Sequence, residues 1–321
     1  MTDGMDRALL VTQAHAAIAR GSKSFAMASR LFDRTTRERV WLLYAWCRRC
    51  DDLADAQDMG GKLGEAVRDQ REAENRLATI RTLTELAQAG EPTGDPAFDA
   101  FGVVAQECGI TRAMAEDVIE GFALDAADWR PRSEADMLRY CYHVAGAVGV
   151  MMAVVMGVAP DDDDTLDRAC DLGIAFQLAN IARDLAEDDA AARCYLPLEW
   201  LAEADIPPGE QMKPHYRRAL LPLVGRLCRL EDAYEASARV GAGRLNFRQR
   251  WAVLAAAGIY GAIAGEVEKA GRHAWNHRIG TTRMAKLGHV AYALWEASTP
   301  PPQGTDTPPW SRRALAERAR A

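Results

Sequence analysis

The chain has 321 residues, which is long enough for one large or two small domains with a sizeable core. Its 49% hydrophobic and 26% charged residues are typical of a globular protein. The net charge of −7 argues against a nucleic-acid binder, which usually carries a basic excess. Seven cysteines without regular spacing indicate buried thiols in a reducing compartment, and the polar start MTDGMDRALL does not match a signal peptide. We therefore expect a cytoplasmic protein.

Helices are expected along the chain, and no stretch shows the sustained apolar/polar alternation of a half-buried strand. Apolar residues recur at spacings of three and four in residues 63–89, 112–126, 135–156 and 166–186. We predict an all-α fold with a single domain over residues 1–298 and a flexible C-terminal tail over residues 299–321. The most apolar segment, residues 144–159, is shorter than the roughly 20 residues of a membrane span, so it is interpreted as a buried core helix.

The first charged cluster, WCRRCDDLAD (Trp46–Asp55), directly follows an apolar helical run. Asp51 and Asp55 are four residues apart and share a helix face, where like charges repel weakly. Arg48 is spaced to pair with Asp51 or with Asp52. A solvated helix end, a salt-bridged face and a metal site are all compatible with this stretch alone.

A second cluster, QLANIARDLAEDDAAARCYLP (Gln177–Pro197), repeats the spacing with Asp184 and Asp188. Arg183 and Glu187 are also four apart and could support the helix as an ion pair. Two carboxylate pairs that face each other across a cavity would repel strongly without cations between them. Mg²⁺ prefers oxygen ligands and commonly takes one or two carboxylates plus substrate phosphate oxygens. The two clusters together therefore favour a site for divalent cations and a phosphorylated substrate.

Competing metal and phosphate motifs are weak. Cys47 and Cys50 have no second cysteine pair, and His273 and His277 lack the glutamate of a metalloprotease helix. Both pairs are interpreted as structural. No glycine-rich phosphate loop of either common type is present, which indicates that the substrate brings its own phosphate.

Four motifs in order resemble the squalene/phytoene synthase family, most closely its bacterial phytoene-forming members. They are GSKSFAMASRLF (Gly21–Phe32), YAWCRRCDDLAD (Tyr44–Asp55), YCYHVAGAVG (Tyr140–Gly149) and the second aspartate cluster with its RCYLP end. The resemblance extends from about Gly21 to Arg278. One departure is Ala192, where family members often have glycine, which leaves the conformation of that turn open.

The resemblance implies the isoprenoid synthase fold, a helical bundle around a central cavity. It also implies head-to-head joining of two geranylgeranyl diphosphates through a cyclopropyl diphosphate to give phytoene, without a reductant. Mg²⁺ would assist loss of diphosphate, with Mn²⁺ as a substitute, since prearranged cations stabilise the developing charge.

The same resemblance assigns site residues, and each has a plainer alternative. Asp51, Asp55, Asp184 and Asp188 would hold metal, while Asp52 is left open between ligand, support and arginine partner. The serines could instead cap a helix, the aromatic residues could be core packing, and the small residues could serve close helix packing. Catalytic roles fall to Arg48, Tyr44, Tyr195 and Arg193, and substrate binding to Ser22, Ser24, Phe25, Tyr140, Val144, Ala145, Val148, Gly149, Gln177, Asn180, Tyr260 and Arg278.

The expected partners are prenyl diphosphate substrates, with no nucleic acid and no obligate protein partner. Peripheral attachment to the inner face of a membrane is an open alternative, because the substrate and product are lipophilic. Other functions considered are a squalene-type synthase that uses farnesyl chains and NADPH, a terpene cyclase, and a non-catalytic helical assembly factor. Retention of all four metal-site aspartates disfavours the last of these.

Overall fold

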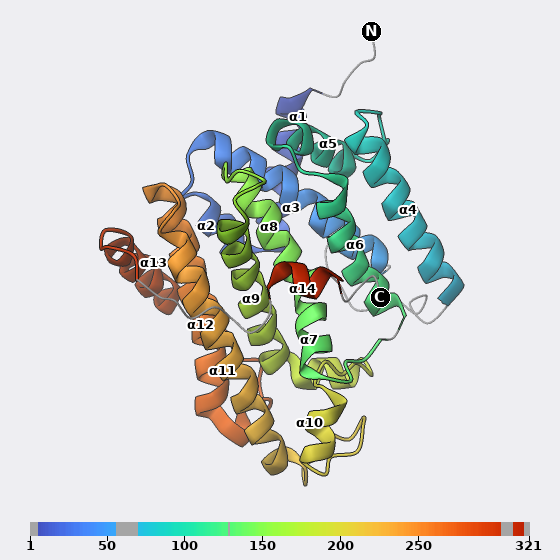
Figure 1. The fold of residues 1–321 in the computed structure, drawn as a ribbon, viewed down its shortest axis with the longest axis vertical. Coiled ribbons are helices and arrows are strands. Elements are labelled where there is room, and N and C mark those ends of the chain that lie inside the picture. The colour runs from blue at the N-terminus through green and yellow to red at the C-terminus, as the bar shows by residue number, and fades with distance from the viewer. Residues whose placement is uncertain (1–5, 56–69, 128, 303–310, 318–321) are drawn as a thin grey trace. The chain divides into compact units, whose positions relative to one another are not determined.

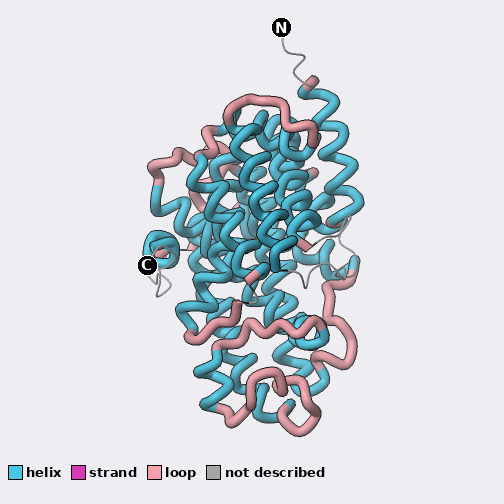
Figure 2. The backbone as a smooth tube through the Cα atoms, turned by 90° about the vertical axis from the view of Figure 1, so that its right-hand side faces the viewer, coloured by secondary structure: helices cyan, strands magenta, loops and turns pink. Residues whose placement is uncertain are grey.

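The computed structural model describes residues 6–55, 70–127, 129–302 and 311–317. Within these ranges all regular secondary structure is helical, as Figure 2 shows, and the all-α prediction is confirmed. The helix expected over residues 63–89 is present from Gln70 to Gln88, and residues 63–69 lie outside the described residues.

The residues divide into two compact units. Unit 1 contains residues 1–127 and 150–163, and unit 2 contains residues 128–149 and 164–321. Each unit is described by itself below. The prediction of a single domain over residues 1–298 stays a prediction.

Unit 1 is built from helices whose ends are marked by local sequence signals. Asp33 accepts a hydrogen bond from the amide of Thr36 at 3.0 Å and so caps α3. Pro96 occupies the first turn of α5, where its missing N–H costs nothing, and Gly109 ends that helix with a φ of 74°. The helices that lie wholly in unit 1 are α1 (Arg7–Gly21), α2 (Lys23–Ser29), α3 (Arg34–Ala54), α4 (Gln70–Gln88), α5 (Pro96–Cys108) and α6 (Arg112–Ala126).

Helix α3 contacts α1, α4, α5 and α6 (Figure 1). Its Trp46 is fully buried and stacks on Phe101 of α5 with ring centroids 4.2 Å apart. The indole N–H of Trp46 donates to the hydroxyl of Thr84 on α4 at 3.2 Å, so this buried polar atom is satisfied. This packing fixes the rotation of α3 about its axis, which decides where the aspartates two turns later point.

Unit 2 contains the longer helices. Ser133 and Asp136 form a capping box at the start of α7, and Asn246 and Gln249 form another at the start of α12. The helical elements are α7 (Glu134–Cys141), the π-helix η2 (Tyr142–Gly146), α8 (Ala147–Val155, which continues into unit 1), α9 (Asp163–Ala190), α10 (Leu198–Glu203), α11 (Arg217–Ala242), α12 (Phe247–Ala270), the 3₁₀ turn η3 (Gly271–His273), α13 (Arg283–Ala297) and α14 (Arg312–Glu317).

Small residues let the backbones of η2, the start of α8 and α9 come close together. A Cβ added to Gly149 would lie 2.3 Å from the carbonyl oxygen of Ala169, and one added to Gly173 would lie 2.2 Å from that of Ala145. No real side-chain carbon tolerates such distances, so glycine is required at both positions. Close helix packing, one of the two readings of these small residues, is therefore what the glycines do.

Two further segments bear on the sequence predictions. Helix α14 forms inside the segment expected to be a flexible tail; Leu315 is fully buried, and Arg312 pairs with Asp167 of α9 at 2.9 Å. Two helical stretches of the described chain, Glu134–Val155 and Phe247–His273, are long and apolar enough to cross a membrane on length and composition alone. The first is 67% buried in its most apolar window, as expected of the core helix that the sequence predicted there.

Candidate active site

The first aspartate cluster lies at the C-terminal end of α3 in unit 1. The guanidinium of Arg48 donates to Asp51 at 2.9 Å and to Asp52 at 2.5 Å, so both predicted partners are engaged. Asp52 is only 4% exposed, whereas the side chain of Asp51 is 43% exposed. Asp55 follows the last helical turn, and its amide donates to the carbonyl of Asp51 at 3.0 Å. The geometry makes Asp52 the buried partner of Arg48 and leaves the carboxylate of Asp51 within reach of a ligand.

Negative charge is crowded around Asp51. Burial raises the pKa of this carboxyl to about 6; Arg48 lowers it, while Asp55, Asp52 and Asp125 raise it. Asp125, near the end of α6, was not found from the sequence, because an isolated aspartate on another helix carries no motif. A cation bound here would relieve the repulsion, and the carboxylate oxygens are of the kind that Mg²⁺ prefers.

Aromatic and hydroxyl groups from the N-terminal motif also belong to unit 1. Phe25 of α2 stacks on Tyr44 of α3 with ring centroids 5.7 Å apart, and burial raises the pKa of the Tyr44 phenol. The hydroxyl of Ser22 accepts from the amide of Phe25 at 3.3 Å and caps α2, which is the plainer of its two predicted roles. Ser24 lies in the same helix, and its side chain is outside the described part of the structure.

The second aspartate cluster lies near the C-terminal end of α9 in unit 2. Two nitrogens of the Arg183 guanidinium donate to the carboxylate of its neighbour Asp184: Nε donates at 2.7 Å, and Nη2 donates to the other oxygen. Arg278, which follows η3, reaches the same carboxylate at 3.2 Å. The indole of Trp275 anchors that segment to α9 by donating to the carbonyl of Ala182 at 2.9 Å. Asp184 is thus held by two arginines, and Arg278 lies beside this cluster.

Arg183 requires a correction to the sequence analysis. Its spacing suggested an ion pair with Glu187, but its guanidinium turns to Asp184 instead. Adjacent residues on a helix seldom face each other, so spacing rules favour the i,i+4 partner. The fork geometry of arginine matches both oxygens of one carboxylate, which explains the choice.

The remaining polar residues of α9 follow the predicted ladder. The amide of Asn180 donates to Gln177 at 3.5 Å, and both side chains are partly exposed. Asp188, one turn beyond Asp184, is also partly exposed. Gln177, Asn180, Asp184 and Asp188 lie at spacings of three and four, so they share a face of the helix.

A tight turn ends α9 just before Arg193. Ala192 has a φ of 61°, in the left-handed region that glycine favours. The amide of Ala192 donates to the carbonyl of Asp189 at 2.9 Å, and that of Arg193 donates to the carbonyl of Asp188 at 2.8 Å. This pattern is a Schellman motif with alanine in the glycine position. The turn therefore keeps the left-handed conformation despite the departure from the family pattern.

Predicted aromatic residues of unit 2 stack in pairs. Tyr140 of α7 and Tyr195 stack with ring centroids 4.6 Å apart, and Trp129 also stacks on Tyr140 with ring centroids 6.0 Å apart. Tyr260 of α12 stacks on Phe176 of α9 at 4.2 Å, and burial raises the pKa of the Tyr260 phenol. Trp129 and Phe176 had no motif to mark them.

The predicted prenyl-binding residues of η2 and α8 are all partly exposed. These residues are Val144, Ala145, Val148 and Gly149, and the backbones of Ala145 and Gly149 also pack against α9. The π-helical turn over Tyr142–Gly146 lies within this segment. Such turns are frequent at functional sites.

Divalent metal binding is compatible with the donors present in each unit. No group of three or more histidine, cysteine, aspartate or glutamate residues gathers around one point within the described ranges. Mg²⁺ does not need such a cage, because one or two carboxylates and substrate phosphate oxygens suffice. The cysteine pair is a poor alternative, since burial raises the pKa of Cys47 to about 12 and that of Cys50 well above its usual range.

Comparison with solved structures defines the class of protein. The chain matches a dehydrosqualene synthase solved with a ligand, with a TM-score of 0.79, 24% identity and coverage of 91% of this chain and 98% of that one. It also matches a squalene synthase from Alicyclobacillus acidocaldarius, with a TM-score of 0.73, 20% identity and coverage of 83% and 95%. The fold is the isoprenoid synthase fold.

Sequence comparison narrows the class to a family. The family model described as squalene/phytoene synthase matches residues 18–286, which include parts of both units. The chain belongs to the squalene/phytoene synthase family. It is 46% identical to a phytoene synthase of Pseudescherichia vulneris, over 94% of this chain and 98% of that protein. It is 44% identical to a 15-cis-phytoene synthase of Pantoea ananas, over 92% and 94%.

Proposed function

We propose that this chain joins two geranylgeranyl diphosphates head to head to form phytoene, as a prenyltransferase of carotenoid biosynthesis. The observation that carries the proposal is the pairing of both aspartate motifs with arginines, at Arg48 in unit 1 and at Arg183 and Arg278 in unit 2. Relatives at 46% and 44% identity that bear the name phytoene synthase support the choice of product.

The arginines and aspartates suit diphosphate chemistry because they can exchange partners. Arg48 and Arg278 are held by carboxylates. Diphosphate oxygens are strong acceptors for such donors, and Asp51 and Asp184 are the carboxylates that would hold Mg²⁺. Bound Mg²⁺ supplies charge neutralisation for the leaving diphosphate. Arg193 and the phenol of Tyr195 are further proposed diphosphate contacts, and Mn²⁺ is a proposed substitute metal.

The proposed reaction then proceeds through allylic and cyclopropyl cations that must be kept from water. Departure of the first diphosphate leaves an allylic cation, which the double bond of the second substrate attacks; loss of one proton then closes the ring of a cyclopropyl diphosphate. A second ionisation, rearrangement and loss of one proton give phytoene, so no reductant is consumed. The aromatic pairs Phe25–Tyr44 and Tyr140–Tyr195 are suited to stabilise these cations through their ring faces. Val144 and Val148 are the proposed contacts of a prenyl tail.

The proposal includes the setting in which the enzyme works. The family match across both units supports a single functional domain over residues 1–298. We place the enzyme in the cytoplasm, peripherally attached to a membrane that stores its lipophilic substrate and product. No obligate protein partner is required by this reaction.

Product identification tests the activity directly. The purified protein is incubated with geranylgeranyl or farnesyl diphosphate and Mg²⁺, with and without NADPH. We expect phytoene from the C20 substrate, independent of NADPH. A C30 hydrocarbon as the sole product would favour the squalene-type alternative, and no product from either substrate would refute the proposal.

A matched pair of variants tests the metal site. Asp184→Asn should reduce turnover by at least about 10²-fold, because it removes a proposed metal ligand. Asp189→Asn is the control: Asp189 is on the same helix and accepts from Gln211 at 2.7 Å, outside the polar ladder. Near-normal turnover of Asp184→Asn, with helicity by circular dichroism unchanged in both variants, would refute the assigned role.

A further inference from the structure

Helix α13 of unit 2 has its apolar side chains on the outside. Met284 is 76% exposed, and Tyr292 and Trp295 are each 59% exposed. Leu287 and Leu294 are exposed as well, and only Ala293 and Ala297 of this helix are buried. Most water-exposed helices show the opposite pattern, with the apolar stripe turned toward the core. The exposed apolar side chains lie on one side of α13, because residues three, seven, eight or eleven apart, such as Met284, Leu287 and Trp295, share a face of a helix.

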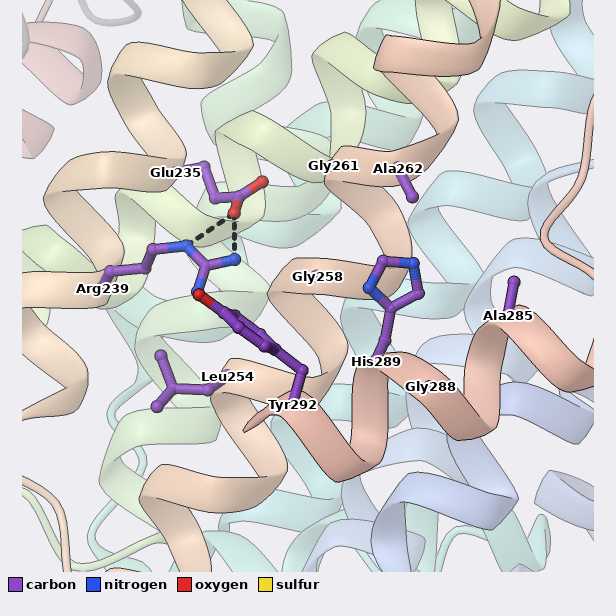
Figure 3. Close-up of a pocket in the computed structure, with 10 residues that line it drawn as sticks. All are labelled: Glu235, Arg239, Leu254, Gly258, Gly261, Ala262, Ala285, Gly288, His289 and Tyr292. Carbon is purple, nitrogen blue, oxygen red and sulfur yellow. Dashed lines mark hydrogen bonds and ion pairs between the residues drawn. The ribbon is translucent and has the colours of Figure 1, made fainter. Parts of the chain in front are cut away.

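The inward side of α13 is held by polar contacts. Glu296 pairs with Arg239 of α11 at 2.6 Å, and Arg239 also pairs with Glu235. The indole of Trp251 on α12 donates to the carbonyl of Val290 at 2.8 Å. Figure 3 shows the open pocket between these helices, about 500 Å³ in volume, which is lined by glycines and alanines together with Glu235, Arg239, Leu254, His289 and Tyr292. Of the large side chains of α13, Tyr292 lines this pocket, whereas Met284, Leu287 and Trp295 are not among its lining residues.

Charge on this face indicates what kind of partner fits it. The exposed residues of α13 include Arg283 at its start and no carboxylate, although the whole chain carries a net charge of −7. Its acidic residue, Glu296, is turned inward to Arg239. The rings of Tyr292 and Trp295 lie together with centroids 5.3 Å apart. Aromatic rings, aliphatic side chains and flanking basic residues without acids are the composition of a helix that lies in the interface of an anionic bilayer.

We propose that the exposed face of α13 is the surface by which the protein docks on an anionic lipid membrane. The helix would lie along the bilayer surface with Met284, Leu287 and Trp295 inserted among the lipid chains. Arg283 would contact lipid phosphates. This inference rests on the proposed membrane attachment and assigns it to one surface.

Vesicle binding tests the proposal. The full chain is mixed with phosphatidylcholine vesicles, with and without phosphatidylglycerol, and the bound fraction is measured by co-sedimentation. We expect binding that is stronger with phosphatidylglycerol. The double variant Leu287→Ser/Trp295→Ser should bind at least about tenfold more weakly, since two large apolar side chains no longer insert. Arg283→Glu should weaken binding only to the anionic vesicles.

Leu9→Ser is the matched control, because Leu9 is a 48% exposed leucine on α1 in unit 1. We expect it to bind as the unmodified protein does, and all variants should make phytoene from detergent-dispersed substrate at the unmodified rate. Unchanged vesicle binding by the double variant would overturn the assignment to α13 and leave the membrane attachment standing. An unmodified protein that makes phytoene but ignores both vesicles would overturn both ideas about membranes, not the activity. A dimer in light scattering that the double variant dissociates would mean that this face binds a second copy instead.

Discussion

Replacement of Ala192 by glycine should stabilise the protein, because the alanine holds a left-handed turn at a φ of 61°. An L-residue in this conformation costs about 1–2 kcal/mol of stability, which glycine avoids. Glycine also has more conformational freedom in the unfolded chain, which lowers the stability of the folded state by roughly 0.5–1 kcal/mol and offsets part of the gain. The expected net gain is about 1 kcal/mol, provided the hydrogen bonds from the amides of Ala192 and Arg193 stay in place. With an unfolding entropy of about 2.1 cal/mol/K per residue, this gain corresponds to about 1.5 °C for the 321 residues unfolding together.

Urea unfolding followed by far-UV circular dichroism measures this gain more sensitively than the small thermal shift. Ala190→Gly is the control, since Ala190 is an exposed residue in the last turn of the same helix without a left-handed φ. The free energy of unfolding of Ala190→Gly should be lower by up to about 1 kcal/mol, which is the usual cost of glycine in a helix. If Ala192→Gly were no more stable than the unmodified protein, the left-handed turn would not be strained and the reasoning would fail.

Three further predictions follow from the same structure. Asp52→Asn should lower the free energy of unfolding by about 2 kcal/mol in urea titrations, because it removes the buried negative charge that pairs with Arg48. Asp51→Asn should change it by under about 0.5 kcal/mol, since Asp51 is more exposed. Equal losses would contradict the different roles assigned to the two aspartates. Burial beside Glu235 raises the pKa of Glu231 to about 8, so the folded state binds a proton more tightly and stability falls as pH rises from the ordinary glutamate range to about 8. Glu231→Gln should therefore gain more stability over the unmodified protein at pH 8.5 than at pH 5, and a constant difference would count against the shift. Chelation of divalent metal should abolish turnover, and added Mg²⁺ should restore it. Activity that persists through extensive chelation would contradict the proposed need for a metal.

Short-range patterns were sufficient to predict the helical class and both aspartate clusters. The spacing of Asp184 and Asp188 follows from helix geometry, so the face that they share could be read directly from residue number, whereas Asp55 lies just beyond the end of α3. The buried helix around residues 144–159 was recognisable by its length and apolar composition. The family resemblance depended on four motifs in order, and the comparisons confirm it.

Contacts between side chains that are far apart in the sequence could not be predicted from residue spacing. Arg278 meets Asp184 across 94 residues, because Trp275 anchors the intervening segment to α9. Asp125 adds its charge to the surroundings of Asp51 from another helix. Neither contact has a spacing rule, since each depends on how helices pack side by side.

The sequence by itself determined that this protein is a helical member of the squalene/phytoene synthase family with two carboxylate motifs. It left Asp52 open between ligand and arginine partner, and only tertiary structure decided for burial against Arg48. Tertiary structure likewise turned the apolar side of α13 outward, although its periodicity alone would place that side in a core. The physical reason is common to both cases. Periodicity sets which residues share a face of a helix, whereas the packing of neighbouring helices sets whether that face meets protein or solvent.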